Sequence, residues 1–247
     1  MRFTLFREDP PIEEEDRHWV HRRMKFLADR FGMSQLRLRR SVEPTAEFFP
    51  DPYDGTEAAA RNLLVRVCPV MEVPAAQVDL KFYNDHRDCP EHSLELLDNR
   101  ESERPAPNTR RCVSIRTDLA AEAGVVVALI AHQLSRLRIV TAKLLTSEEG
   151  DFGPLTDLAT VYFGMGIFTA STCVRFSQWT HVQWSGWEAS RLGFLDEQTY
   201  GYALALWSLI RGEDRPGWAN HLAVNPKSYM KQSIRFLRRH PPAEFTL

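Results

Sequence analysis

The stretch that most constrains the fold is AGVVVALIAHQLSRLRIVTAKLL, residues 123–145. Apolar residues lie on every side of a helix drawn through its first half, and a helix of that kind is buried in a protein core. Thr117 and Asp118 precede it, and such residues are typical of a helix start. The sequence therefore predicts one long, buried helix that begins near Thr117.

The residues before this helix are predicted to form both helices and strands. Helical spacing of apolar residues, with acidic residues in the first turn and Gly32 at the end, predicts a helix over residues 12–31. The same spacing predicts a second helix from Thr56 to about Met71. Alternation of apolar and polar residues predicts three short strands, over residues 34–42, 77–85 and 111–116.

The C-terminal half is predicted to be helical. One helix begins at Pro154, a favoured first-turn residue, and continues through LTDLATVYFGMGIF. Two more are expected over residues 197–211 and 225–240, and the polar, proline-rich segment 98–110 is expected to be a mobile loop. The predicted fold class is α+β, mostly helical with a small sheet from the N-terminal half. We expect a single domain, 1–247, with a strand and helix part to about 116 and a helical part from about 117.

Composition excludes several classes of partner. The chain has 31 basic and 33 acidic residues, so no overall positive field favours nucleic acid. The longest uncharged stretch, Leu158–Val174, is shorter than the roughly 20 apolar residues of a membrane span. The N-terminus has no apolar run typical of a signal peptide, and the four cysteines are widely spaced, as in reduced thiols. We therefore expect a cytoplasmic protein that binds neither nucleic acid nor membrane.

The central helix contains part of a metal-site pattern. In H-E-x-x-H helices two histidines four residues apart hold zinc, and the glutamate is the general base. Here His132 stands at the first position, Gln133 at the base position and Arg136 at the second ligand position. An amide cannot accept the proton of zinc-bound water, and a guanidinium offers a metal no lone pair.

The surrounding residues resemble an uncharacterised bacterial zincin-like family. The resemblance covers about residues 45–210 and is most specific in LIAHQLSRLRI, in GPLTDLATVYFGMGIFTA and in SRLGFLDEQTYGYALALWSLIRGE. It implies a zincin-like scaffold, with a third ligand supplied by an E-x-x-x-D pattern on the following helix. In this chain Gly153 stands in place of that glutamate, and Asp157 is retained.

These departures favour a catalytically inactive zincin-like protein, a pseudo-metallopeptidase with a structural or protein-interaction role. We expect no catalytic residue, no metal and no cofactor at the degenerate site, which consists of His132, Gln133, Arg136, Gly153 and Asp157. The Arg136 guanidinium is expected to take the place of zinc and to pair with Asp157, because a buried carboxylate needs a compensating charge. The partners are expected to be proteins, contacted through Trp179, Trp184 and Trp187 or through the basic C-terminal helix.

Two alternatives stay open. One is a zinc-dependent hydrolase or peptidase with substitute ligands, in which His132 and Asp157 are joined by His181, His221 or Glu188. The other is a small-molecule binding module, in which Arg136 attracts an anion into the vacated site. Two further histidine groups are assigned to polar surface: His86 and His92 with Cys89, and the pair His18 and His21.

Overall fold

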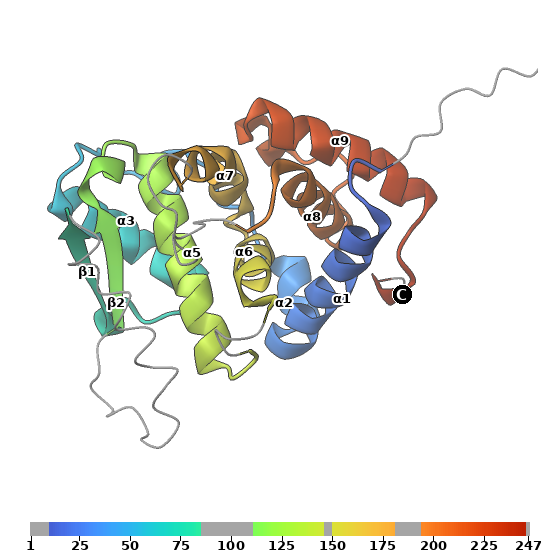
Figure 1. Cartoon of the computed structure of the whole chain (residues 1–247), viewed down its shortest axis with the longest axis horizontal. Helices are drawn as coiled ribbons and strands as arrows, with labels where there is room; N and C mark the ends of the chain where they lie inside the picture. Colours follow the sequence, from blue (N-terminus) through green and yellow to red (C-terminus); the bar gives the residue numbers. More distant parts are fainter. Residues whose placement is uncertain (1–9, 85–110, 146–149, 181–193, 246–247) are drawn as a thin grey trace, which may run out of the picture. The chain divides into compact units, whose positions relative to one another are not determined.

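The computed structural model describes residues 10–84, 111–145, 150–180 and 194–245, with the backbone alone for 174–180. The predicted α+β class is confirmed: most of the chain is helical, and two strands form a small parallel sheet (Figure 1). The residues gather into two compact units, one made of Met1–Ser41 with Val161–Leu247 and the other of Val42–Thr160. That the chain forms a single domain stays a prediction.

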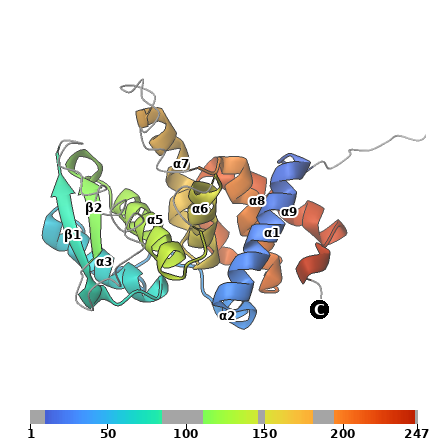
Figure 2. The same ribbon diagram turned by 60° about the horizontal axis from the view of Figure 1, so that its bottom comes forward.

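The central unit, Val42–Thr160, contains the sheet. Its elements are helix α3 (Glu57–Val70), strands β1 (Val78–Tyr83) and β2 (Arg111–Arg116), helix α5 (Ala123–Thr141) and most of helix α6 (Phe152–Tyr162). The strands run parallel, with Val78 opposite Arg111 and Leu80 opposite Val113. Helix α3 contacts β1 and α5, and α5 also contacts β2, so α5 lies between the sheet and α6 (Figures 1 and 2).

Local sequence signals explain several boundaries in this unit. The hydroxyl of Thr56 accepts a hydrogen bond from the Ala59 amide at 3.2 Å, which caps α3 where the sequence predicts it. Helix α5 is buried on all sides over Val125–Ala131, as its composition predicts. Its predicted start near Thr117 is wrong, however, and Asp118 binds the Arg116 guanidinium through both oxygens, at 2.6 and 2.9 Å, instead of capping α5. Residues Thr117–Leu119 form a separate 3-10 helix, and α5 begins at Ala123.

The other unit is built from helices in the part of the chain that the structure describes. These are α1 (Glu14–Phe31), α2 (Met33–Leu38), α7 (Gly166–Thr180), α8 (Glu197–Ile210) and α9 (Val224–Arg239). Helix α8 packs along α9 and also contacts α1 and α7 (Figure 1). The two helices approach closely at Gly201, where a methyl group would lie 2.6 Å from Tyr229 Cβ and 2.9 Å from the Met230 amide nitrogen.

The strand predicted over residues 34–42 is wrong. Residues Met33–Leu38 form a short helix instead, directly after Gly32, whose φ of 107° separates it from α1. In a strand Leu36 and Leu38 would share a face, but Leu36 is fully buried and Leu38 is 76% exposed. Residues two apart on a helix point in nearly opposite directions, which explains the difference.

The helix predicted to run from Pro154 through Phe168 is divided. Gly164 adopts a φ of 87°, and α6 therefore ends at Tyr162 while α7 begins at Gly166. A side chain at Gly164 would also collide with the backbone carbonyl of Arg40. The glycine thus serves a turn and a close backbone approach, which an apolar sequence pattern does not distinguish from a helix interior.

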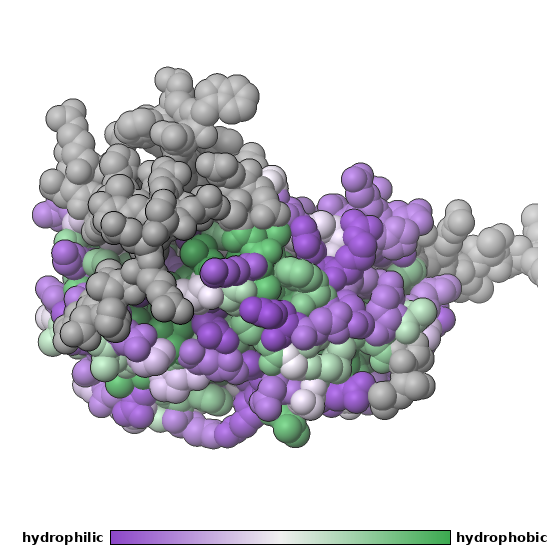
Figure 3. Space-filling view, turned by 90° about the horizontal axis from the view of Figure 1, so that it is seen from below, coloured by the Kyte–Doolittle hydropathy of each residue, from purple (hydrophilic) through white to green (hydrophobic). Residues whose placement is uncertain are grey.

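One described helix, α5, is long and apolar enough to cross a membrane by length and composition, and 61% of the relevant window is buried inside the structure. A central helix of a folded domain has the same properties. Figure 3 shows hydrophilic and hydrophobic residues mixed on one face of the molecule. Among the described residues, the large apolar side chains that are exposed are Leu38, Val65, Phe194 and Val224, which come from four separate places in the chain.

Candidate functional site

The residues predicted to form a degenerate metal site lie mainly where α5 and α6 face each other within the unit Val42–Thr160. The imidazole Nε2 of His132 is 3.3 Å from Oδ1 of Asp157, an ion-pair distance when the imidazole is protonated. The Asp157 side chain is 1% exposed and that of His132 is 16% exposed. A buried carboxylate requires a nearby positive charge or hydrogen-bond donors, and His132 is placed to meet that need.

Arg136 lies one helical turn after His132, and the expected ion pair between Arg136 and Asp157 is wrong. The Arg136 guanidinium instead lies over the ring of Phe152, 5.4 Å from its centre. A guanidinium in that position is attracted to the electrons of the ring face. Since His132 already stands beside Asp157, the half-buried arginine has a less costly environment on the ring.

Gln133 points to the other side of α5, towards the sheet. Its Oε1 accepts a hydrogen bond from the Ser114 amide at 2.8 Å, and its Nε2 donates to the Ser114 carbonyl, also at 2.8 Å. Ser114 belongs to β2 and is 8% exposed. The Gln133 carboxamide thus makes with the backbone of Ser114 the two hydrogen bonds that the backbone of a neighbouring strand would make. A carboxylate could accept from the amide but could not donate to the carbonyl.

The two helices bring the predicted positions together in register. His132 of α5 meets Asp157 of α6, and Arg136, one turn later in α5, meets Phe152 in the first turn of α6. Gly153 is buried next to Phe152 and lies four residues before Asp157, on the same face of α6. The structure therefore places His132, Arg136, Gly153 and Asp157 at one helix–helix contact, while Gln133 belongs to the contact with the sheet.

The residues present do not fit an H-E-x-x-H zinc site. His132 and Asp157 offer two donors, the Gln133 amide is engaged with Ser114, and Arg136 has no lone pair to offer. Among the described residues there is no group of three or more histidine, cysteine, aspartate or glutamate side chains that could hold a metal ion.

The other predicted site residues are not brought to this contact by the described part of the chain. Trp184 and Trp187 lie outside the described residues, and of Trp179 only the backbone is described. His86, Cys89, His92, His181 and Glu188 are also outside the described residues. His221 belongs to the other unit.

The two N-terminal histidines differ from one another. His18 is exposed, as predicted. The surface assignment is wrong for His21, whose Nε2 lies 2.8 Å from the Tyr202 hydroxyl in a half-buried contact between α1 and α8. Burial lowers the pKa of His21, because desolvation disfavours the imidazolium. The apolar spacing of α1 contains this information, since His21 lies three residues before the buried Met24 and seven before the buried Ala28.

Two partners at the site were not identified from sequence. Ser114 takes part through its backbone, so its side-chain type carries no signal for the contact with Gln133. Phe152 has an aromatic ring at the start of α6, but its position under Arg136 depends on how α5 and α6 pack.

Comparison with known proteins finds no family model, no curated protein and no solved structure that matches this chain.

Proposed function

We propose that the protein is a catalytically inactive, zincin-like protein that acts as a structural or protein-interaction component. The observation that carries this proposal is the double hydrogen bond between the Gln133 carboxamide and the Ser114 backbone. At the position where a hydrolase needs a proton acceptor, this chain has a group that joins a helix to a strand. The residue is therefore suited to holding the fold together and unsuited to general-base chemistry.

Two further contacts support the same proposal. Arg136, at the second ligand position, covers the Phe152 ring, and His132 faces the buried carboxylate of Asp157. Each of these side chains contributes to the packing of α5 against α6. We infer that the helix pair serves as a scaffold whose former catalytic positions now stabilise it, and that the biological role depends on a protein partner.

Zinc analysis of the untagged full chain tests the proposal. We expect less than about one tenth of a zinc per chain after incubation with excess zinc and desalting, because stable sites need three or four ligands. The matched variant combines Arg136→His and Gly153→Glu, which would complete the ligand set, with Gln133→Glu, which would restore the general base. This variant is expected to retain about one zinc per chain. Stoichiometric zinc in the unaltered protein would overturn the proposal, and no gain of zinc in a folded triple variant would argue against a zincin-like scaffold.

One observation favours the second candidate, a zinc-dependent hydrolase with substitute ligands. Two ligands of a tetrahedral zinc lie about 3.3 Å apart, and His132 Nε2 and Asp157 Oδ1 are separated by 3.3 Å. If these two atoms share a metal, Asp157→Asn lowers zinc content while Glu72→Gln, a change to an exposed carboxylate of the same unit, does not. Equal zinc content in the two variants excludes the second candidate.

A further inference from the structure

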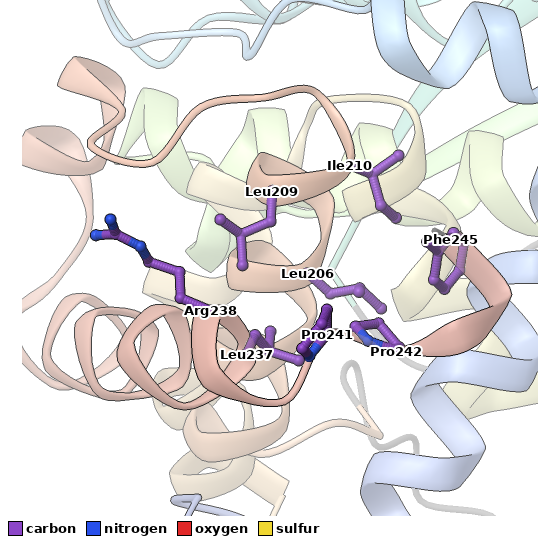
Figure 4. Close-up of a pocket in the computed structure, with 8 residues that line it drawn as sticks. All are labelled: Leu206, Leu209, Ile210, Leu237, Arg238, Pro241, Pro242 and Phe245. Carbon is purple, nitrogen blue, oxygen red and sulfur yellow. The ribbon is translucent and has the colours of Figure 1, made fainter. Parts of the chain in front are cut away.

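An apolar pocket lies at the C-terminal end of α8 and α9, within the unit made of Met1–Ser41 and Val161–Leu247. Leu206 and Leu209 of α8, Leu237 of α9 and Phe245 of the C-terminal segment are among its lining residues (Figure 4). The cavity volume is about 190 Å³. A dry cavity of about 150 Å³ accepts benzene, so this space takes an apolar group of about six to eight carbon atoms.

One charged residue, Arg238, contributes to the lining. Figure 4 shows its side chain at the opposite end of the pocket from Phe245, with the guanidinium directed away from the other labelled side chains. The guanidinium lies 3.6 Å from Oδ2 of Asp214, and both side chains are about half exposed, at 51% and 55%. An ion pair exposed to this extent contributes little free energy, so Arg238 can exchange its partner at small cost.

The surroundings of Arg238 are strongly basic. Helix α9 contains five lysine or arginine residues between Val224 and Arg239 and no acidic residue. Arg239 and His240 follow Arg238 directly and are exposed. The acidic side chains nearest in sequence to the pocket residues are Glu213, which binds Arg211 and Trp218, Asp214, and the exposed Glu244. Arg238 is therefore the one cationic side chain among the lining residues, and the other lining residues are apolar.

We propose that this pocket binds a small amphipathic monoanion, an alkyl carboxylate of medium chain length. The alkyl chain lies between α8, α9 and Phe245, and the carboxylate reaches the Arg238 guanidinium in place of Asp214. Apolar walls supply affinity through buried area, and the single guanidinium selects the head group. This site is in a different unit from α5 and is independent of the function proposed for that helix.

Calorimetric titration of the full chain with sodium octanoate tests the proposal, with 1-octanol and octylammonium as probes that share the tail and differ in the head group. We expect octanoate to bind at least about fivefold more tightly than either, a difference of about 1 kcal/mol. Arg238→Gln should weaken octanoate about fivefold and leave octanol unchanged. Arg235→Gln, which removes an exposed charge one turn earlier in α9 and outside the lining, should leave both unchanged.

A second variant tests the apolar part of the site. Leu209→Trp places a large ring at a half-exposed lining position, where it can fill the pocket without disturbing a fully buried side chain. It should abolish binding of octanoate and octanol alike. The proposal is overturned if the unaltered protein binds no octanoate at a concentration of about 5 mM. It is also overturned if Arg238→Gln and Arg235→Gln have the same effect on octanoate binding. Unchanged octanoate binding by folded Leu209→Trp protein would place the ligand elsewhere.

Discussion

At the scale of single residues, substitution of Gln133 tests how α5 is joined to the sheet. Both of its hydrogen bonds go to the backbone of the nearly buried Ser114, so Gln133→Leu leaves an amide and a carbonyl without these partners. Leaving buried polar groups unpaired costs about 2–3 kcal/mol. We expect that loss in the free energy of unfolding, measured by urea denaturation monitored by circular dichroism.

At the same position, the stability of a Gln133→Glu variant is expected to depend on pH. The carboxylate would face the Ser114 carbonyl, whereas the protonated acid could donate to it, so the folded protein raises the pKa of the new side chain. A raised carboxyl pKa destabilises the fold above that pKa, and the penalty disappears below the unfolded value of about 4.3. The stability difference from the unaltered protein should therefore shrink between neutral pH and about pH 4. Gln133→Leu is the control, and its deficit should not vary with pH in this way.

A second prediction concerns His21 and the pH dependence of the free energy of unfolding. Burial against α8 lowers its pKa below 6.5, so the unfolded chain binds more protons than the folded one as the pH falls through 6.5. Stability contributed by the neutral imidazole is present above pH 6.5 and is lost on acidification. We expect His21→Asn to flatten the decline of unfolding free energy between pH 7 and 5, and the exposed His18→Asn to leave it unchanged. Identical slopes in all three proteins would contradict this account of His21.

The candidate site was predictable from sequence only as far as residue spacing reaches. His132 and Asp157 meet because an i, i+4 pattern on each of two consecutive helices brings these faces together. The roles of Gln133 and Arg136 were not predictable, since each depends on a partner that only packing supplies. Ser114 contributes backbone atoms, and Phe152 contributes a ring that competes with Asp157 for the guanidinium.

At the scale of elements, the α8–α9 contact depends on Gly201. A methyl group there would lie 2.6 Å from Tyr229 Cβ and 3.1 Å from the Pro226 carbonyl oxygen. Overpacking of this kind costs about 1–3 kcal/mol, which exceeds the roughly 1 kcal/mol that alanine gains over glycine inside a helix. Gly201→Ala should therefore lower the midpoint of thermal unfolding. Gly124→Ala, in α5 where nothing lies within 4 Å, should leave the midpoint unchanged or raise it.

The elements were predicted well where periodicity and caps agree, and poorly where a tertiary contact decides. Helices α3 and α9 and strand β2 follow their sequence patterns closely. Helix α2 does not, because the alternation of leucine and arginine over residues 36–39 fits a strand or a helix equally well until Leu36 is buried. The break at Gly164 likewise depends on the approach of the Arg40 backbone.

At the scale of the whole molecule, the two compact units raise the question of whether their stabilities are linked. Gln133→Leu removes a contact within Val42–Thr160, and Gly201→Ala disturbs one within the other unit. Units with their own cores commonly open separately, and hydrogen exchange measures each opening.

We therefore expect each substitution to lower amide protection in its own unit, as followed by hydrogen exchange with mass spectrometry. Gln133→Leu should speed exchange in β2 and α5, and Gly201→Ala should speed it in α8 and α9. The slowest amides of the other unit should keep their rates in each case, because their opening does not require the altered contact to break. If either substitution accelerates the slowest amides of both units to the same extent, the chain opens as one cooperative structure, and the single domain expected from its sequence is then the correct description.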